Sequence, residues 1–399
     1  MQRTKIALLR LDYLLGAAII LCQILYLRQL VSILFYISFF VSAALWVCTT
    51  TESLDKLDWL AIAIVLLAFV HVAINAALTG ASFSFEYLKK YIMFCCSVIF
   101  LAAIRRISLD QTTFRFLEAL FLLIGAFMLF MYLFRNQQMH LLNGQYTRYL
   151  TFRFTNPNLT ALFLSCMMMF LEVAAFQEKR VPMKILLFAM AAAELVFLYQ
   201  TESRNALLAV LAFTVFSLLF FLRKKHLTFR KGTLWLVAIV PLLFAIVYLY
   251  FVDSTGFAKL FSFFAGEGKK LNSRTKIWLP AFQAFAASPI FGAYYQVSGG
   301  TGSSQLHNTH VDILASYGLS ILILVCIFLY LLMRDKQKKV TSPAQNSTLL
   351  GFICALLLGI GEAALFSGGL SVYLFFGIFL AATGEEQRTE DSRAFRLSQ

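Results

Sequence analysis

The chain has little charge, few prolines and no stretch that could form a soluble domain. Only 14% of its 399 residues are charged, whereas 60% are hydrophobic. A typical soluble domain has about 25% charged residues, so this composition excludes a soluble protein. The apolar residues form long unbroken runs rather than alternating ones, which excludes a β-barrel. The sequence therefore indicates an all-α membrane protein.

Motifs for metals, disulfides and redox chemistry are also missing. The seven cysteines all lie inside apolar runs, which is typical of small packing residues. His307 and His310 stand three residues apart and could share a helix face as metal ligands, but no third ligand is evident. We therefore expect neither a metal nor another cofactor.

Apolar runs long enough to cross a bilayer recur along the whole chain. We predict about 12 transmembrane helices in one integral membrane domain, 1–399, with one long external loop, 253–309, between the ninth and tenth. The predicted spans are 11–27, 30–48, 58–78, 88–104, 114–134, 157–177, 183–200, 204–222, 233–252, 310–333, 347–366 and 369–384.

Basic residues predict how these spans are oriented. Lys and Arg gather in alternate connections, at 105–106, 179–184, 223–231 and 334–339. Because positively charged loops stay inside, we expect these connections and both termini to be cytoplasmic. The connection at 49–57 carries little positive charge and is the weakest part of this assignment. The net charge of +14 then reflects loops that meet anionic lipids, so we expect membrane lipids and not nucleic acid as partners.

Some basic residues fall on the opposite side, where positive charge is unusual, and three of them stand out. Arg204 follows a tight turn and begins a helix, where a guanidinium and backbone N–H groups together suit a phosphate. It could instead extend to lipid headgroups. Arg274 lies in the long loop, and His307 precedes the tenth span as a candidate general base. This arrangement predicts a bound anion, such as a lipid diphosphate, on the external side.

The long loop contains a predicted amphipathic helix that begins near Asn272 and breaks at Ser288. Arg274, Lys276 and Trp278 then lie near headgroup level. An interfacial helix anchored by Arg and Trp explains this segment equally well. Elsewhere, the connection at 135–156 places Arg148 and Arg153 among aromatic residues, which suits either a sugar diphosphate or a membrane belt.

Four short motifs, in this order, carry a resemblance to a known family. They are Thr155-Asn156-Pro157-Asn158-Leu159-Thr160-Ala161; Ser203-Arg204; Arg274 with Trp278 and then Ser288-Pro289-Ile290-Phe291-Gly292; and His307-Asn308 with Asp312-Ile313-Leu314 and Tyr317-Gly318-Leu319. Over roughly residues 155–320 the chain resembles the O-antigen ligase and polysaccharide polymerase superfamily of bacterial membranes. It departs from the family at Asn205, where Gly is common, and at Glu202, an acid beside the proposed phosphate site.

The resemblance implies an inverting glycosyltransferase with a GT-C-like fold in the bacterial cytoplasmic membrane. The implied donor is a glycan on undecaprenyl diphosphate at the outer face, and the acceptor is another glycan, which can be lipid-linked. A repeat-unit polymerase is favoured because the external loop is compact. The alternatives are an O-antigen ligase that uses lipid A core, and a lipid-linked oligosaccharide transporter. A membrane sensor or scaffold would need an output module, which the short C-terminal tail does not provide.

Roles for individual residues follow from the chemistry of the implied reaction. The chain has no Asp-x-Asp pair to hold a divalent ion, so fixed cations are expected to stabilise the departing diphosphate. We assign this role to Arg204 and Arg274, and removal of the acceptor proton to His307. Candidate substrate-binding residues are Arg148, Arg153, Lys276, Asn308 and Trp278.

Overall fold

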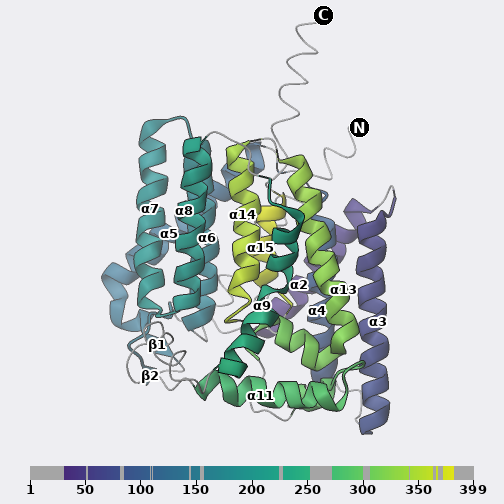
Figure 1. Cartoon of the computed structure of the whole chain (residues 1–399). Helices are drawn as coiled ribbons and strands as arrows, with labels where there is room; N and C mark the ends of the chain where they lie inside the picture. The colour runs from purple at the N-terminus through teal and green to yellow at the C-terminus, as the bar shows by residue number, and fades with distance from the viewer. Residues whose placement is uncertain are drawn as a thin grey trace, which may run out of the picture.

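The computed structural model is an all-helical bundle with one small β-hairpin (Figure 1). The residues it describes are 31–50, 53–80, 85–107, 109, 111–142, 145–152, 157–223, 228–251, 272–299, 306–340, 342–362, 365–366 and 372–381. The predicted first span, 11–27, lies outside these residues.

The helices follow the predicted apolar runs closely. In chain order they are α2 (Val31–Thr49), α3 (Lys56–Thr79), α4 (Phe85–Ile104), α5 (Gln111–Met139), α6 (Pro157–Gln177), α7 (Val181–Gln200), α8 (Arg204–Arg223) and α9 (Lys231–Phe251). After them come α11 (Asn272–Ala287), α12 (Tyr294–Gly299), α13 (Thr309–Lys339), α14 (Pro343–Leu358) and α15 (Val372–Ala381). Two antiparallel strands, β1 (Leu141–Leu142) and β2 (Gln145–Tyr146), lie between α5 and α6.

Seven helices of the described residues are long and apolar enough to cross a membrane. They are α3, α5, α6, α7, α8, α9 and α13, and shorter apolar stretches occur in α2 and α14. The protein is therefore a multi-pass membrane protein. The prediction of about 12 spans exceeds the seven that meet these criteria in the described part of the chain.

Two helices form the centre of the bundle. Of the most apolar stretch of each helix, 94% of residues are buried in α6 and 72% in α13, against 28–39% in the other five spanning helices. The peripheral helices instead present large apolar side chains outward, among them Leu222, Tyr199 and Phe134. An outward apolar surface of this extent suits lipid and not water.

The bundle has two distinct ends. At one end, α11 lies across the bundle near the β-hairpin, at the bottom of Figure 1; we call this the α11 end. At the other end α4 finishes, followed directly by Arg105 and Arg106; we call this the Arg105 end. The basic connections that the sequence assigned to the cytoplasm all follow or precede helices at the Arg105 end.

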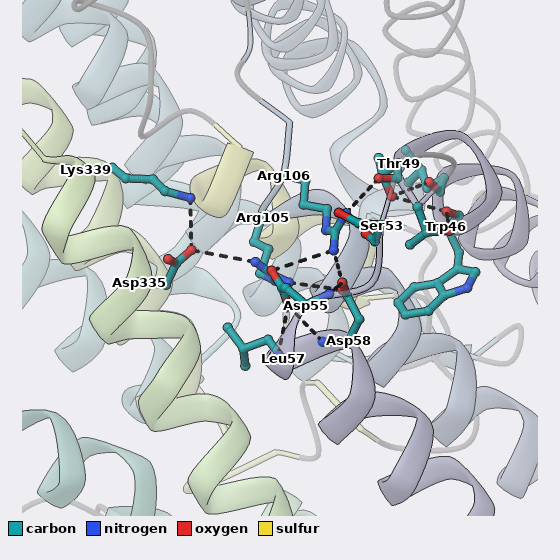
Figure 2. Close-up of polar contacts among 12 residues, drawn as sticks. Trp46, Thr49, Ser53, Asp55, Leu57, Asp58, Arg105, Arg106, Asp335 and Lys339 are labelled. Carbon is teal, nitrogen blue, oxygen red and sulfur yellow. Dashed lines mark hydrogen bonds and ion pairs between the residues drawn. The ribbon is translucent and has the colours of Figure 1, made fainter.

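Ion pairs at the Arg105 end join three helices (Figure 2). Asp55 caps α3 in a capping box with Asp58. Arg105 Nη2 donates to Asp55 Oδ1 at 2.6 Å and to Asp58 Oδ1 at 3.0 Å, and Arg106 also pairs with Asp58. Asp335 of α13 lies 3.9 Å from Arg105 Nη1. The acidic connection at 49–57 therefore shares an end with 105–106 and with the last turn of α13.

Candidate active site

A buried carboxyl group is the centre of the polar cluster at the α11 end. α14 ends at Leu358, and a turn through Gly359 and Gly361 leads to Glu362. Only 6% of the surface of Glu362 is exposed. An acid buried this deeply needs hydrogen-bonding or charged partners. Three side chains among the described residues contact the Glu362 carboxyl group, and each comes from a different segment of the chain.

Arg274, in the first turn of α11, is the first partner. Its Nη2 donates to the Gly361 carbonyl at 2.9 Å and lies 3.3 Å from Glu362 Oε1. α11 is itself anchored, because the indole Nε1 of buried Trp278 donates to the Leu306 carbonyl at 2.7 Å. The side chain of Arg274 keeps 28% of its surface exposed, so it can still meet a ligand.

His307, immediately before α13, is the second partner. Its Nδ1 lies 2.8 Å from Glu362 Oε2. Because a carboxylate accepts, this contact favours the proton on Nδ1 and leaves Nε2 with a lone pair. His307 has a left-handed backbone conformation (φ 51°), and Asn308 follows it as the N-cap of α13. Asn308 is buried and donates to the carbonyls of Pro241 and Ile360, so its side chain holds backbone in place.

Asn158, near the start of α6, is the third partner and donates to Glu362 Oε1 at 2.5 Å. The residue belongs to the first of the four motifs noted in the sequence. Three of those motifs therefore meet at one carboxyl group.

Arg204 begins α8 beside this cluster. The next residue, Asn205, donates to the Leu358 carbonyl at 3.0 Å. A side-chain carbon added at Gly361 would lie 3.0 Å from Asn205 Nδ2, so the start of α8 touches the turn that Arg274 binds. Arg204 is half-buried, and among the described residues it has neither a hydrogen-bond partner nor an acid partner. Within the described part of the chain, its positive charge is therefore uncompensated.

The acid beside Arg204 has a different partner. Glu202 Oε2 lies 3.2 Å from Arg148 Nη2, and the Arg148 guanidinium also packs over the Tyr149 ring at 5.0 Å. The hydrogen bond to Tyr149, followed by the charge of Glu202, raises the pKa of Arg148. Arg148 is thus an exposed arginine that already has an acid partner. Lys276 is exposed on α11, and Arg153 lies outside the described residues.

A second ion pair lies one helical turn into α13. Lys90 Nζ of α4 is 2.6 Å from Asp312 Oδ1 and 2.9 Å from Ser316 Oγ. The sequence reasoning did not consider Lys90, although it stands at the start of a span on the side where positive charge is unusual. Here the cation and the acid neutralise each other. The partners of two other acids in apolar helices are Arg115 for Glu118 and Thr214 for Glu172.

No motif in the sequence identified Glu362 as part of the site. The predicted span 347–366 placed it within the membrane, whereas α14 ends at Leu358. The available signal was the Gly359-Ile360-Gly361 sequence, since closely spaced glycines end helices.

His310, considered as a metal ligand, donates from Nε2 to the Ala238 carbonyl of α9 at 2.6 Å. In the described part of the chain, no three His, Cys, Asp or Glu residues group as metal ligands would.

The cluster has the parts required for chemistry on an anionic leaving group. Two arginines adjoin one turn, and an imidazole is oriented by a carboxylate. Among the residues that the structure describes, one of the arginines has no acid partner and the second imidazole nitrogen has no hydrogen-bond partner. Such groups stabilise developing negative charge and accept a proton.

Part of the chain is similar to a known protein family. Residues 185–326 match the Wzy_C family, described as O-antigen ligase. This stretch includes Arg204, Arg274 and His307, but neither Asn158 nor Glu362. No curated protein matches the chain. Residues 185–326 are therefore similar to an O-antigen ligase domain.

Proposed function

We propose that this membrane protein, with an O-antigen ligase domain at residues 185–326, is an inverting glycosyltransferase that acts outside the cytoplasm. Its donor is a glycan on undecaprenyl diphosphate, and its acceptor is a second, lipid-linked glycan, so the product is a longer polysaccharide. The α11 end faces the extracytoplasmic side, and the Arg105 end and both termini face the cytoplasm. The whole chain acts as one membrane domain, with the loop at 253–309 contributing to the active site.

One observation carries this proposal. Arg274 and His307 share the carboxyl group of Glu362, and Arg204 lies beside the same turn without an acid partner in the described residues. A partly buried cation without a charged partner is energetically unfavourable unless an anion binds to it. A lipid diphosphate has the charge and the oxygen atoms that two arginine side chains bind well.

The reaction needs one bond broken, one formed and one proton moved. The bond between the sugar C1 and the diphosphate oxygen breaks, and its electron pair leaves with the lipid diphosphate. Arg204 and Arg274 stabilise the charge that develops there. The acceptor hydroxyl oxygen bonds to C1 from the opposite face, and His307 Nε2 takes its proton. Fixed cations thus serve where a divalent ion would otherwise be required.

Glu362 is a positioning residue in this scheme. Its two oxygens face different groups, Oε2 towards His307 and Oε1 towards Arg274 and Asn158. It therefore fixes the base relative to the leaving-group arginine, and pre-set geometry of this kind accounts for much of enzymatic rate enhancement. Trp278 and Asn308 contribute in the same way, through the backbone groups they bind.

The test uses purified protein in lipid nanodiscs with an undecaprenyl-diphosphate-linked glycan as both donor and acceptor. We expect release of lipid diphosphate together with a new glycosidic bond, measured by mass spectrometry. His307→Ala should lower turnover by about 10²–10⁴-fold, and Arg274→Lys by about 10²–10³-fold, because Lys lacks the planar fork. Arg180→Lys, at an exposed arginine of the Arg105 end, is the matched control and should keep full activity.

Other outcomes assign the protein differently. Movement of the lipid-linked glycan across the bilayer without a new bond would indicate a transporter and sink the proposal. Transfer only to lipid A core would make the protein a ligase. Activity that a chelator abolishes and a divalent ion restores would show that the arginines do not act alone.

A further inference from the structure

Two of the family motifs meet far from the reacting groups. α13 breaks at Gly318, which has φ 81° and ψ 178°, and so consists of two helical pieces. The turn at 288–293, which follows α11, inserts at this break. Leu319 N donates to the Pro289 carbonyl at 2.9 Å, and Ala293 N donates to the Ala315 carbonyl at 2.7 Å. Backbone hydrogen bonds therefore join the α11 segment to α13 on both sides of the break.

Two glycines let the backbones approach this closely. A side-chain carbon at Gly318 would lie 2.0 Å from the Ile290 carbonyl oxygen, and one at Gly292 would lie 2.4 Å from the Ser316 carbonyl oxygen. Both glycines also have positive φ values, which other residues rarely adopt. The junction thus has one well-defined geometry.

Two buried polar residues of α3 hold the junction in place. The His71 ring Nδ1 lies 2.7 Å from the Tyr317 carbonyl, so it must donate, and the ring packs edge-on against Phe291 at 5.2 Å. Asn75, one turn later, donates to the Gly292 carbonyl at 2.9 Å and accepts from Tyr295 N at 3.1 Å. Each side chain is 4% exposed. α3 lies outside the family-matched residues 185–326.

The junction connects the two halves of the candidate active site. Arg274 lies at the first turn of α11, upstream of the 288–293 turn, and His307 directly precedes α13. The two segments meet again where Trp278 binds the Leu306 carbonyl. Any shift of the junction would move α11 along α13 and change the spacing between the arginine and the imidazole.

We infer that His71 and Asn75 are positioning residues for glycosyl transfer, and that they act by fixing α11 against the break in α13. The inference rests on the proposed function and adds a part of the chain that the family match does not include. Neither residue touches the substrate; both set the alignment of Arg274 with His307. Misplacement by about 1 Å through a distant substitution can cost about 100-fold in rate.

The first experiment measures kcat and donor KM in nanodiscs for His71→Ala, His71→Asn and Asn75→Ala. The two alanine variants should lower kcat per folded molecule by about 10- to 100-fold and change donor KM less, because alignment matters most in the transition state. His71→Asn should stay within about threefold of wild type, since an Asn amide can take the place of Nδ1–H. Thr79→Ala is the matched control, because the Thr79 hydroxyl donates to backbone carbonyls of its own helix, those of Asn75 and Ala76.

A second measurement separates positioning from general stability. If Asn75 acts through Arg274, Asn75→Ala should have almost no further effect in an Arg274→Lys background, whereas independent effects would multiply. Hydrogen exchange at Leu319 and Ala293 should also accelerate in both alanine variants.

The outcomes distinguish the inference from the proposed function. Three results would overturn the inference but not the proposed function. The first is a full kcat in Asn75→Ala while Arg274→Lys is impaired. The others are multiplied effects in the double variant and unchanged hydrogen exchange. Undiminished transfer by Arg274→Lys and His307→Ala would overturn the proposed function, and the exchange data would then still report whether α3 fixes the junction.

Discussion

The two ends of the bundle use arginine in opposite ways. At the Arg105 end, Arg105 and Arg106 face three aspartates, Asp55, Asp58 and Asp335 (Figure 2). At the α11 end, a single carboxyl group serves both Arg274 and His307, and Arg204 beside them has no acid partner among the described residues. Arg105 and Arg106 are thus paired with acids within the fold, whereas Arg204 is paired with no acid among the described residues.

The difference separates a structural role from a functional one. Asp58 is fully buried and Arg105 is 4% exposed, so each charge there requires the other. Burial raises the pKa of Asp55, but the hydrogen bonds from Arg105 and the Leu57 backbone and the charges of Arg105 and Arg106 together lower it below its usual value. Arg204 has no such acid among the described residues. We interpret its surroundings as a site where an anionic substrate binds.

The difference between the two ends is tested most directly by substituting Arg204, the arginine that has no acid partner among the described residues. Arg204→Lys should lower kcat/KM for the lipid-linked donor by about 10²–10³-fold, because Lys cannot bind a phosphate with two parallel hydrogen bonds. The melting temperature should not change, since no internal ion pair is lost. Paired assays of transfer and thermal unfolding in nanodiscs check both statements. An unaltered rate together with a lower melting temperature would assign Arg204 to structure.

A substitution at the Arg105 end should have the opposite result, with lower stability and little change in activity. Asp58→Asn leaves Arg105 buried with its charge only partly compensated, and breaking a buried pair costs about 3–5 kcal/mol of unfolding free energy. Transfer per folded molecule should stay within about twofold of wild type. Denaturant unfolding followed by tryptophan fluorescence, with activity normalised to folded protein, provides the measurement. A slow but fully stable variant would show that the Arg105 end also affects catalysis.

Most of the fold was predictable, because it depends on local sequence. Apolar runs gave the helices from α2 to α9 to within a few residues, and the cap at Asn272 with the break at Ser288 matches the bounds of α11. The rule that spans need about 20 apolar residues failed at α14. The rule extended the predicted helix past Gly359, so Glu362 was assigned to a membrane span instead of to the site.

The long-range contacts of the site could not be obtained in this way. Residues 158, 274, 307 and 362 meet only because four segments fold together, and no local pattern encodes that. For the same reason, the sequence places Glu202 beside Arg204 in the chain but does not show that Glu202 pairs with Arg148. Motif order suggested which residues matter, but only the fold shows which of them touch.

A matched pair of acid-to-amide changes compares the two ends directly. Glu362→Gln should lower kcat by about 100-fold, because an amide has one acceptor oxygen and cannot receive hydrogen bonds from both His307 and Arg274. Asp335→Asn at the Arg105 end removes an acid that also has two basic partners, and should leave kcat unchanged. Equal losses in both variants would remove the distinction between the ends.

The smallest expected effect is a pH dependence that belongs to the Arg105 end. The backbone N–H of Arg180, then the Arg180 and Arg115 side chains, lower the pKa of Glu178 from 4.5 to about 2 despite some opposing burial. A group with a lowered folded pKa stabilises the fold above its unfolded value, and this contribution disappears as the pH falls through the folded value. Wild type should therefore melt above Glu178→Gln at pH 7, and the gap should close as the pH falls from 4.5 towards 2. A gap that stays constant over this range would mean that the Glu178 carboxylate contributes nothing through its charge, and that the ion pairs at this end are not what holds it together.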